Sequence, residues 1–200
     1  MKKTFGVMVF IIGLTVCLAG CKSAPTEEIN ATTDALKSIE TADVNTYAPE
    51  SLKAAQDEMN KALAEVKNQD EKFALTRDYK PSVALLKSTK ELVEKAQSEA
   101  EANKAKAKAD AETAISELPS MLQEATDLLA KAPKGKDTKA DLEAMQTDLK
   151  LAEESAAEAN NAMTAEKYVD ALAKANTAKE KTASIIEQVK SARLKLGRRS

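Results

Sequence analysis

Residues 49–70, PESLKAAQDEMNKALAEVKNQD, carry the pattern that decides the fold. Lysines and glutamates occupy one side of this stretch, and the apolar residues recur every three or four positions on the other: Leu52, Ala55, Met59, Leu63 and Val66. Pro49 suits the first turn of a helix, where a missing N–H loses no hydrogen bond. The pattern weakens at residues 68–70. We therefore predict an amphipathic helix over this stretch.

Similar stripes, which are apolar residues that recur at helical spacing, lie before and after residues 49–70. A shorter stripe predicts a helix from Thr26 to Asp43. Downstream, Pro81 begins a helix that could run to Leu118, and Pro119 is expected to break or kink it before a short helix that ends near Ala132. The predicted buried face of the helix after Pro81 comprises Val83, Leu86, Val93, Ala96, Ala100, Ala107 and Ile115.

The second half of the chain has the same helical spacing of apolar residues. Residues 133–136, PKGK, form the clearest turn signal. The helix beyond it presents Leu142, Met145, Leu149, Ala152, Ala156 and Ala159. After Asn160 and Asn161, Thr164 is expected to cap a final helix that presents Tyr168, Leu172, Ala175, Ile185, Ile186, Val189 and Leu196.

These stripes predict an all-α fold, an elongated antiparallel bundle of long helices rich in Ala, Lys and Glu. Glycine and proline number five each in 200 residues, and almost no segment is typical of a strand. Between Ala100 and Ala111 the stripe presents only alanine, so this part should be thin and mobile. Its alanines also favour self-association.

The two halves share an internal similarity. Leu52, Ala54, Gln56 and Ala62 match Leu142, Ala144, Gln146 and Ala152 at an offset of 90 residues. Tyr79, Ala84, Lys90 and Glu91 match Tyr168, Ala173, Lys179 and Glu180 at an offset of 89. A duplicated helical hairpin explains both offsets if its turn differs by one residue. Helices of this composition also align easily without a common origin.

The first twenty residues have the form of a signal peptide. Lys2 and Lys3 form a positive start, and an apolar stretch from Thr4 to Val16 follows. This stretch is shorter than the roughly 20 residues that span a bilayer. Leu18, Ala19, Gly20 and Cys21 close the segment, with small residues directly before the cysteine.

The sequence from Leu18 to Cys21 resembles the lipobox of bacterial lipoproteins. The resemblance implies cleavage before Cys21, a diacylglycerol on its thiol and acylation of the new N-terminus, so that the membrane is a partner through Cys21. Lys22 stands where an aspartate would retain such a protein at the inner membrane, which favours the outer membrane, facing the periplasm. Two other readings remain: a secretory signal cut near Ala19 that leaves a free thiol, and an uncleaved anchor.

A second resemblance covers residues 47–101. The segment from Ala48 to Leu52, followed by Tyr79, is similar to a group of uncharacterised helical envelope lipoproteins, in which an Ala-Pro-Glu-x-Leu helix precedes a tyrosine-led one. Pro81 departs from the alanine expected after that tyrosine. The group has no established activity to carry over.

Composition excludes several chemistries. The chain has no histidine, and its two cysteines are Cys17 in the leader and Cys21, so no disulfide, usual zinc site or Cys–His or Ser–His catalytic set is expected. The net charge is −2, and loss of Lys2 and Lys3 takes it to about −4. With no tryptophan and no basic stripe, the chain lacks the profile of a nucleic-acid-binding protein.

The remaining candidates have ordinary structural explanations. The carboxylate pairs Glu27–Glu28 and Glu153–Glu154 are expected to be solvated, so no catalytic residue, metal ligand or cofactor is predicted. The tyrosines at positions 47, 79 and 168 should cover the bundle ends with their hydroxyls in water. The basic end from Arg193 to Arg199 suits a helix C-terminus or an anionic surface. The final residue, Ser200, gives no support to covalent linkage to peptidoglycan.

We therefore expect a signal peptide (residues 1–20), a tether (21–25), a helical region with the first hairpin (26–132) and a second hairpin with the basic C-terminus (133–200). The expected function is that of a lipid-anchored envelope protein that binds a protein partner or itself through helix faces and has no catalytic activity. The alternative is a ligand-binding or transport-accessory lipoprotein with a groove between the hairpins.

Overall fold

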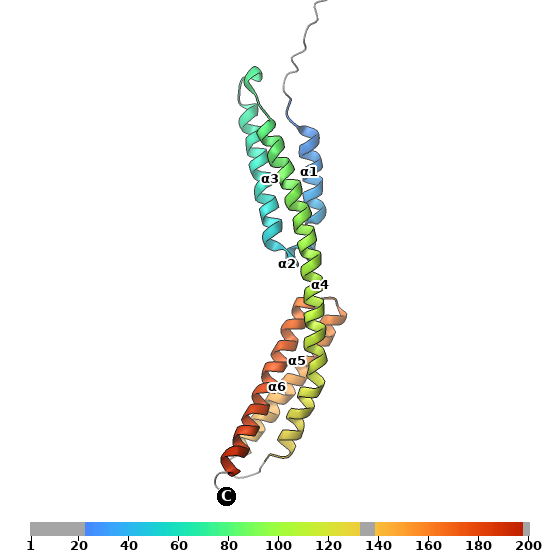
Figure 1. Ribbon diagram of the computed structural model, residues 1–200, viewed down its shortest axis with the longest axis vertical. Helices are drawn as coiled ribbons and strands as arrows, with labels where there is room; N and C mark the ends of the chain where they lie inside the picture. The colour runs from blue at the N-terminus through green and yellow to red at the C-terminus, as the bar shows by residue number, and fades with distance from the viewer. Residues whose placement is uncertain (1–22, 133–138, 198–200) are drawn as a thin grey trace, which may run out of the picture. The chain divides into compact units, whose positions relative to one another are not determined.

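The computed structural model describes residues 23–132 and 139–197, with side chains as far as Leu194. These residues are α-helical and include no strand, as predicted (Figure 1). The elements are α1 (Thr26–Ile39), α2 (Ala42–Tyr47), α3 (Pro49–Asp70), the 3₁₀ turn η1 (Ala74–Thr76), α4 (Lys80–Ala130), α5 (Lys139–Thr164) and α6 (Tyr168–Gly197). The predicted turn at residues 133–136 lies outside the described residues.

The described chain forms two compact units. Unit 1 contains the chain up to Glu40 together with Leu52–Glu94, so it holds α1, most of α3 and the first part of α4. Unit 2 contains Thr41–Ser51 and the chain from Lys95 onward, which adds α2 and the rest of α4 to α5 and α6. Helix α4 therefore contributes to both units.

The core of unit 1 follows alternating spacings of three and four residues. The buried residues of α3 are Leu52, Ala55, Met59, Ala62, Val66 and Gln69. Those at the start of α4 are Ser82, Leu86, Thr89 and Val93, with Tyr79 just before it. Ala62 takes the place predicted for Leu63, which is 40% exposed, and Ser82 takes that of Val83, which is 39% exposed. The alternation is that of knobs-into-holes packing, which admits only the a and d positions to the core.

Unit 2 packs α4, α5 and α6 around small side chains. One cluster of buried residues comprises Ala114, Leu118, Ala156, Ala159, Ala175 and Ala178. A second cluster contains larger residues: Ala125, Leu129, Ala132, Leu149, Ile185 and Val189. Because an alanine side chain projects only a methyl group, the first cluster permits close approach of the helices but removes little apolar surface from water.

Burial supports the predicted internal repeat. The buried positions of α3 recur 90 residues later in α5, where Leu149, Ala152, Ala156 and Ala159 are buried and Leu142 and Met145 pack partly buried against the core. The buried positions from Tyr79 to Ala100 recur 89 residues later at Tyr168, Ala171, Ala175, Ala178, Thr182, Ile185 and Val189. The change of offset falls between Gln69 and Tyr79, a span that is one residue longer than the matching span from Ala159 to Tyr168.

One predicted boundary is wrong near the N-terminal side of α3. The helix predicted to reach Asp43 ends at Ile39, and residues Ala42–Tyr47 form the separate helix α2. The Thr41 hydroxyl accepts a hydrogen bond from the Val44 N–H at 3.3 Å and caps the new helix. The side chain of Asn103 donates to the Tyr47 carbonyl at 2.7 Å. Helix α2 therefore covers part of the alanine stretch of α4 that was expected to be thin.

Pro119 was predicted to break or kink the helix, and the break is wrong, because α4 runs through the proline to Ala130. A proline in a helix interior costs about 3 kcal/mol through a lost hydrogen bond and a steric clash. Here Leu118, Ala125 and Leu129 are all buried in the core of unit 2. The buried residues on both sides of the proline keep the helix continuous. The periodicity of a short stretch of sequence does not reveal this compensation.

The boundary predicted before the last helix needs a similar correction. Helix α5 continues through Asn160 and Asn161 to Thr164, whose hydroxyl donates to the Asn160 carbonyl at 2.9 Å. Thr164 is therefore the last residue of α5 and does not cap α6. The chain reverses over residues 165–167 alone.

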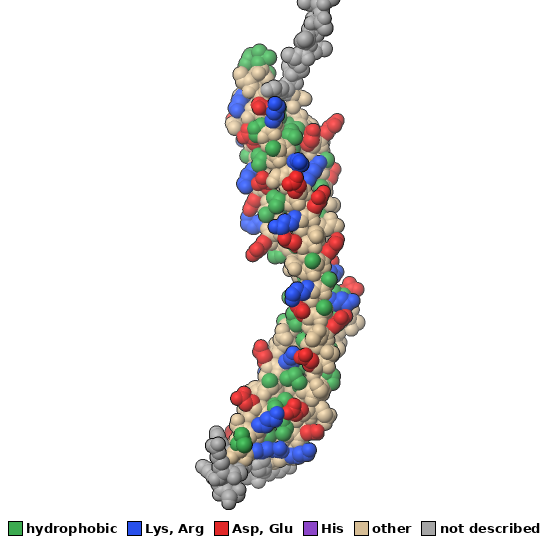
Figure 2. Space-filling view, viewed as in Figure 1, with side chains coloured by type: hydrophobic (Ala, Val, Ile, Leu, Met, Phe, Trp, Pro, Cys, Tyr) green, Lys and Arg blue, Asp and Glu red, His purple; other side chains and the backbone are tan. Residues whose placement is uncertain are grey.

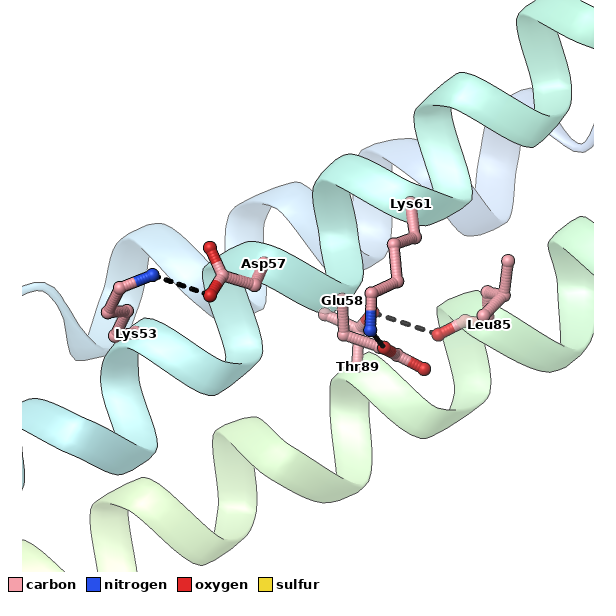
Figure 3. A network of polar contacts seen from close by, with 6 residues as sticks. All are labelled: Lys53, Asp57, Glu58, Lys61, Leu85 and Thr89. Atoms are coloured by element: carbon pink, nitrogen blue, oxygen red, sulfur yellow. Dashed lines mark hydrogen bonds and ion pairs between the residues drawn. The ribbon is translucent and has the colours of Figure 1, made fainter.

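Mixed charges cover both units (Figure 2). Many form ion pairs within one helix, such as Lys53–Asp57 at 2.6 Å and Glu58–Lys61 at 2.9 Å (Figure 3). The hydrogen bond from Lys61 holds the pKa of Glu58 below its usual value, with help from Ser88 on α4. Exposed pairs of this kind contribute about 0.2–1 kcal/mol each, so burial contributes more to stability than these pairs do.

Among the side chains that the structure describes, one buried hydroxyl lacks a hydrogen-bond partner. Thr89 donates to the Leu85 carbonyl at 2.8 Å (Figure 3), and Thr182 donates to the Ala178 carbonyl at 2.7 Å. The Ser82 hydroxyl is fully buried and has no hydrogen-bond partner. Its counterpart in the second half, 89 residues later, is the fully buried Ala171.

We predict that Ser82→Ala stabilises unit 1 by about 1 kcal/mol, because it removes an unsatisfied buried hydroxyl without changing the packing volume much. Urea denaturation followed by circular dichroism measures the change. Ser98→Ala, at an exposed position of the same helix, is the control for helix propensity alone. A gain at Ser82 no larger than that at Ser98 would contradict the prediction.

Candidate functional site

The predicted lipid-attachment residue, Cys21, lies outside the described residues. The description begins at Ser23, and α1 begins at Thr26, so the cysteine is five residues before the first helix of unit 1. The functional features that the structure does describe lie at two places, the connection between α3 and α4 in unit 1 and a pocket in unit 2.

The α3–α4 connection is held by hydrogen bonds at its base. The buried Gln69 side chain donates to Glu65 at 2.6 Å and accepts from the Asp78 N–H at 3.0 Å. The Arg77 guanidinium donates to the Asp70 carbonyl at 2.7 Å and to the Lys72 carbonyl at 3.1 Å. These bonds join the end of α3 to the residues just before α4. The loop therefore has a defined shape although it lies outside both helices.

This connection presents two large apolar side chains to solvent. Phe73 is 72% exposed and Leu75 is 77% exposed, and both lie in or next to η1. The Thr76 N–H and hydroxyl each bond to the Phe73 carbonyl at 2.8 Å, which fixes the turn. Sequence reasoning missed this site. The signal was an apolar triplet, residues 73–75, between charged residues where a polar loop was expected.

The tyrosines were predicted to leave their hydroxyls in water, and this is wrong for Tyr79. Its ring is buried, and its hydroxyl donates a hydrogen bond to the Asp70 carboxylate across the α3–α4 connection. That bond raises the pKa of Tyr79, with smaller contributions from burial and from the negative charge of Asp70. The rings of Tyr47 and Tyr168 are also buried, at the end of α2 and the start of α6.

A pocket of about 450 Å³ lies in unit 2 among α2, the middle of α4 and the α5–α6 turn. Its lining residues are Ala42, Asp43, Thr46, Tyr47, Lys104, Ala165, Glu166, Lys167, Val169 and Asp170. The volume suits a small ligand, but the usual ligand pocket is mainly apolar, and half of this lining is charged. The sequence did not indicate it because Lys104 precedes the turn by about 60 residues and α2 precedes it by about 120.

The electrostatics of the pocket favour binding over catalysis by its lysine. Lys104 Nζ lies 2.7 Å from Asp43 Oδ2, and this hydrogen bond raises the pKa of Lys104, with a smaller contribution from Glu166. A lysine that acts as a nucleophile or base needs a lowered pKa, so that its amine is neutral near pH 7. Lys104 instead stays protonated and presents a positive charge beside carboxylates.

Glu166 occupies a strained backbone position in the α5–α6 turn. Its φ angle is 58°, in the left-handed region that glycine adopts most readily. The Lys167 N–H bonds to the Ala162 carbonyl at 2.9 Å, and the Glu166 N–H bonds to the Met163 carbonyl at 3.1 Å. This pair of bonds defines a Schellman motif, with Glu166 at the position where glycine is preferred.

The other sequence candidates are not brought together. Glu27, Glu28, Glu153 and Glu154 are all exposed on helix surfaces. Among residues 23–132 and 139–194, no group of three or more acidic, histidine or cysteine side chains could hold a metal ion. Arg193 donates to the Leu128 carbonyl at 3.4 Å, and the side chains of the basic segment after Leu194 lie outside the description.

No helix in the described part of the chain is both long enough and apolar enough to cross a membrane. Comparison with known proteins finds no matching family model, no similar curated protein and no similar solved structure. Function must therefore be argued from the residues of this chain.

We predict that Tyr79 ionises at a higher pH than a tyrosine in water. A raised folded pKa means that its contribution to stability is complete below the unfolded pKa of about 10 and is lost as pH rises through the folded pKa. Ultraviolet absorbance of tyrosinate during alkaline titration gives the measurement. Tyr79→Phe should remove the late step and Asp70→Asn should move it to lower pH, whereas an unchanged curve in both variants would refute the assignment.

We also predict that Glu166→Gly stabilises unit 2 by about 1 kcal/mol, because glycine adopts a positive φ without strain. The midpoint of thermal or urea unfolding reports the change. Glu166→Ala is the matched control, since it removes the same carboxylate but keeps the strain, and it should give no such gain. Equal effects of the two substitutions would show that the side chain, rather than the backbone, matters.

Proposed function

We propose that this chain is a lipid-anchored envelope protein, held at the membrane through Cys21, that acts as a structural or protein-interaction module without catalytic activity. The observation that carries the proposal is the lipobox-like sequence from Leu18 to Cys21, placed five residues before the first helix. A short tether of this kind would keep a folded helical body next to the membrane surface.

The helical body supports an interaction role. Many buried residues of unit 2 are alanines, so this unit shields little apolar surface and exposes long helix faces with mixed charge. Ion pairs such as Lys190–Glu124, at 2.7 Å, bridge neighbouring helices at half-exposed positions. Faces of this type bind partners through shape and charge pattern, as helical scaffolds do. A location at the outer membrane, facing the periplasm, follows from Lys22 and forms part of the proposal.

A second candidate function is ligand binding, either directly or as a transport accessory. The pocket lined by Lys104, Glu166 and residues of α2 favours it. Its charged lining would select a small polar or zwitterionic molecule rather than an apolar one. Strain retained at Glu166 is consistent with this role, because backbone strain is often kept where a side chain has a function.

We predict that the mature chain in the membrane fraction carries the mass of a diacylglycerol and a further acyl group on Cys21. Cys21→Ala should lose that mass and its processing before residue 21, because the thioether cannot form. Mass spectrometry of the purified chain is the measurement. A mature N-terminus with a free thiol would refute lipidation and support an ordinary secretory signal.

Cross-linking in cells tests the interaction role of the same protein, with Cys21→Ala as the control for location. Scaffolding requires a reproducible cross-linked partner or a second copy of the chain at a helix face. A monomer without partners would refute it. A small molecule that stays bound in native mass spectra, and is lost in Lys104→Ala, would favour the second candidate instead.

A further inference from the structure

The start of α1 and the α3–α4 connection lie at the same end of unit 1 (Figure 1). Helices α1 and α3 run antiparallel (Figure 1), and Gln56, near the start of α3, donates to Glu40, just after the end of α1, at 2.8 Å. From this contact, Pro25 is 15 residues back along the chain and Asp70 is 14 residues forward. At 1.5 Å per residue both distances are about 21–22 Å. Pro25 and the base of the loop are therefore level with each other.

The attachment point must be near that end. Cys21 is two residues before Ser23, the first described residue, and two residues span at most about 7 Å. A lipid on Cys21 would thus bring this end of unit 1, rather than its opposite end, to the bilayer surface.

The loop at this end is longer and more apolar than closing the hairpin requires. The corresponding hairpin of α5 and α6 closes over residues 165–167 with a Schellman turn and leaves no large apolar residue within it. The α3–α4 connection instead spans residues 71–79 and exposes Phe73 and Leu75 at its tip. Figure 2 shows apolar side chains gathered at this tip. Its hydrogen-bonded base means that little conformational entropy is lost on binding.

We propose that this loop is a second membrane contact, in which Phe73 and Leu75 enter the lipid interface beside the lipidated Cys21. The inference rests on the proposed lipid anchor and adds a defined orientation to it. The acyl chains of the proposed anchor hold the protein at the bilayer but leave its tilt free, and an apolar contact by the loop would fix that orientation. One aromatic and one aliphatic side chain on a rigid loop supply an apolar contact with the membrane without a spanning helix.

The charges around the tip indicate which lipids matter. Lys72, Arg77 and Lys80 lie beside Asp70, Glu71 and Asp78, and the first turn of α1 adds Glu27 and Glu28. These three positive and five negative groups give this end of unit 1 a net charge of −2, so anionic headgroups offer it no net attraction. The contact should depend on apolar burial and should form on neutral phosphatidylcholine as well as on a membrane that also contains anionic lipid.

A single tryptophan probe tests the proposal. The chain has no tryptophan, and Cys21 is the only cysteine of the mature sequence, so the mature Phe73→Trp protein can be coupled through Cys21 to a maleimide phospholipid. In neutral vesicles that contain brominated phosphatidylcholine, we expect the emission of this probe to be blue-shifted and quenched. Adding Leu75→Ser should lower the equilibrium constant for insertion about tenfold or more.

Lys53→Trp is the matched control, because its exposed position lies 17 residues before Asp70, about 25 Å along α3. Quenching at position 73 but not at 53 supports the proposal. Equal quenching at both positions, which means a molecule lying flat on the bilayer, overturns it, and so does quenching at neither. Coupling by maleimide separates this result from natural lipidation. If Cys21 is not acylated in cells the proposed anchor fails, while the vesicle measurement still decides the affinity of the tip.

Discussion

Alanine side chains packed between three helices hold unit 2 together, and the other features of that unit follow from this close approach. Ala159, Ala175 and Ala178 are completely buried within one cluster, where a larger side chain would push the helices apart. Each alanine removes little apolar surface from water, so the stabilisation must be accumulated over long helices. This constraint explains why the buried positions of α5 and α6 keep the same three- and four-residue alternation along each helix.

The continuity of α4 depends on the same burial. Its core-facing residues continue on both sides of Pro119, and the packing of Leu118 and Ala125 offsets the hydrogen bond that the proline cannot make. Exposed ion pairs add only small contributions at such positions. Three features depart from this pattern of packing. The buried hydroxyl of Ser82 has no hydrogen-bond partner, the backbone of Glu166 has a positive φ angle, and the α3–α4 loop exposes apolar side chains to water.

Two of these departures coincide with the functional features of the chain. Glu166 lines the charged pocket of unit 2, and Phe73 and Leu75 stand at the end of unit 1 from which the chain leads to Cys21. The proposed anchor and the apolar loop would act on the same membrane surface, each through buried hydrocarbon. The pocket has a different character, since Lys104 is held protonated by Asp43 and supplies charge rather than reactivity.

The amino-acid sequence by itself determined the all-α class, the repeat offsets of 90 and 89 residues and most core-facing positions, because helix periodicity is local and survives in a short window. It also carries the lipobox-like motif. Only the tertiary structure decided that α2 is separate and covers α4, that α4 passes through Pro119, and that Tyr79 bonds to Asp70. The pocket belongs to the same group, whereas the apolar triplet of the tip is visible in the sequence and only its exposure required the structure. Each of these features depends on contacts between different elements or on burial that offsets a local penalty. The sequence pattern of a single segment reveals neither the contacts nor the burial.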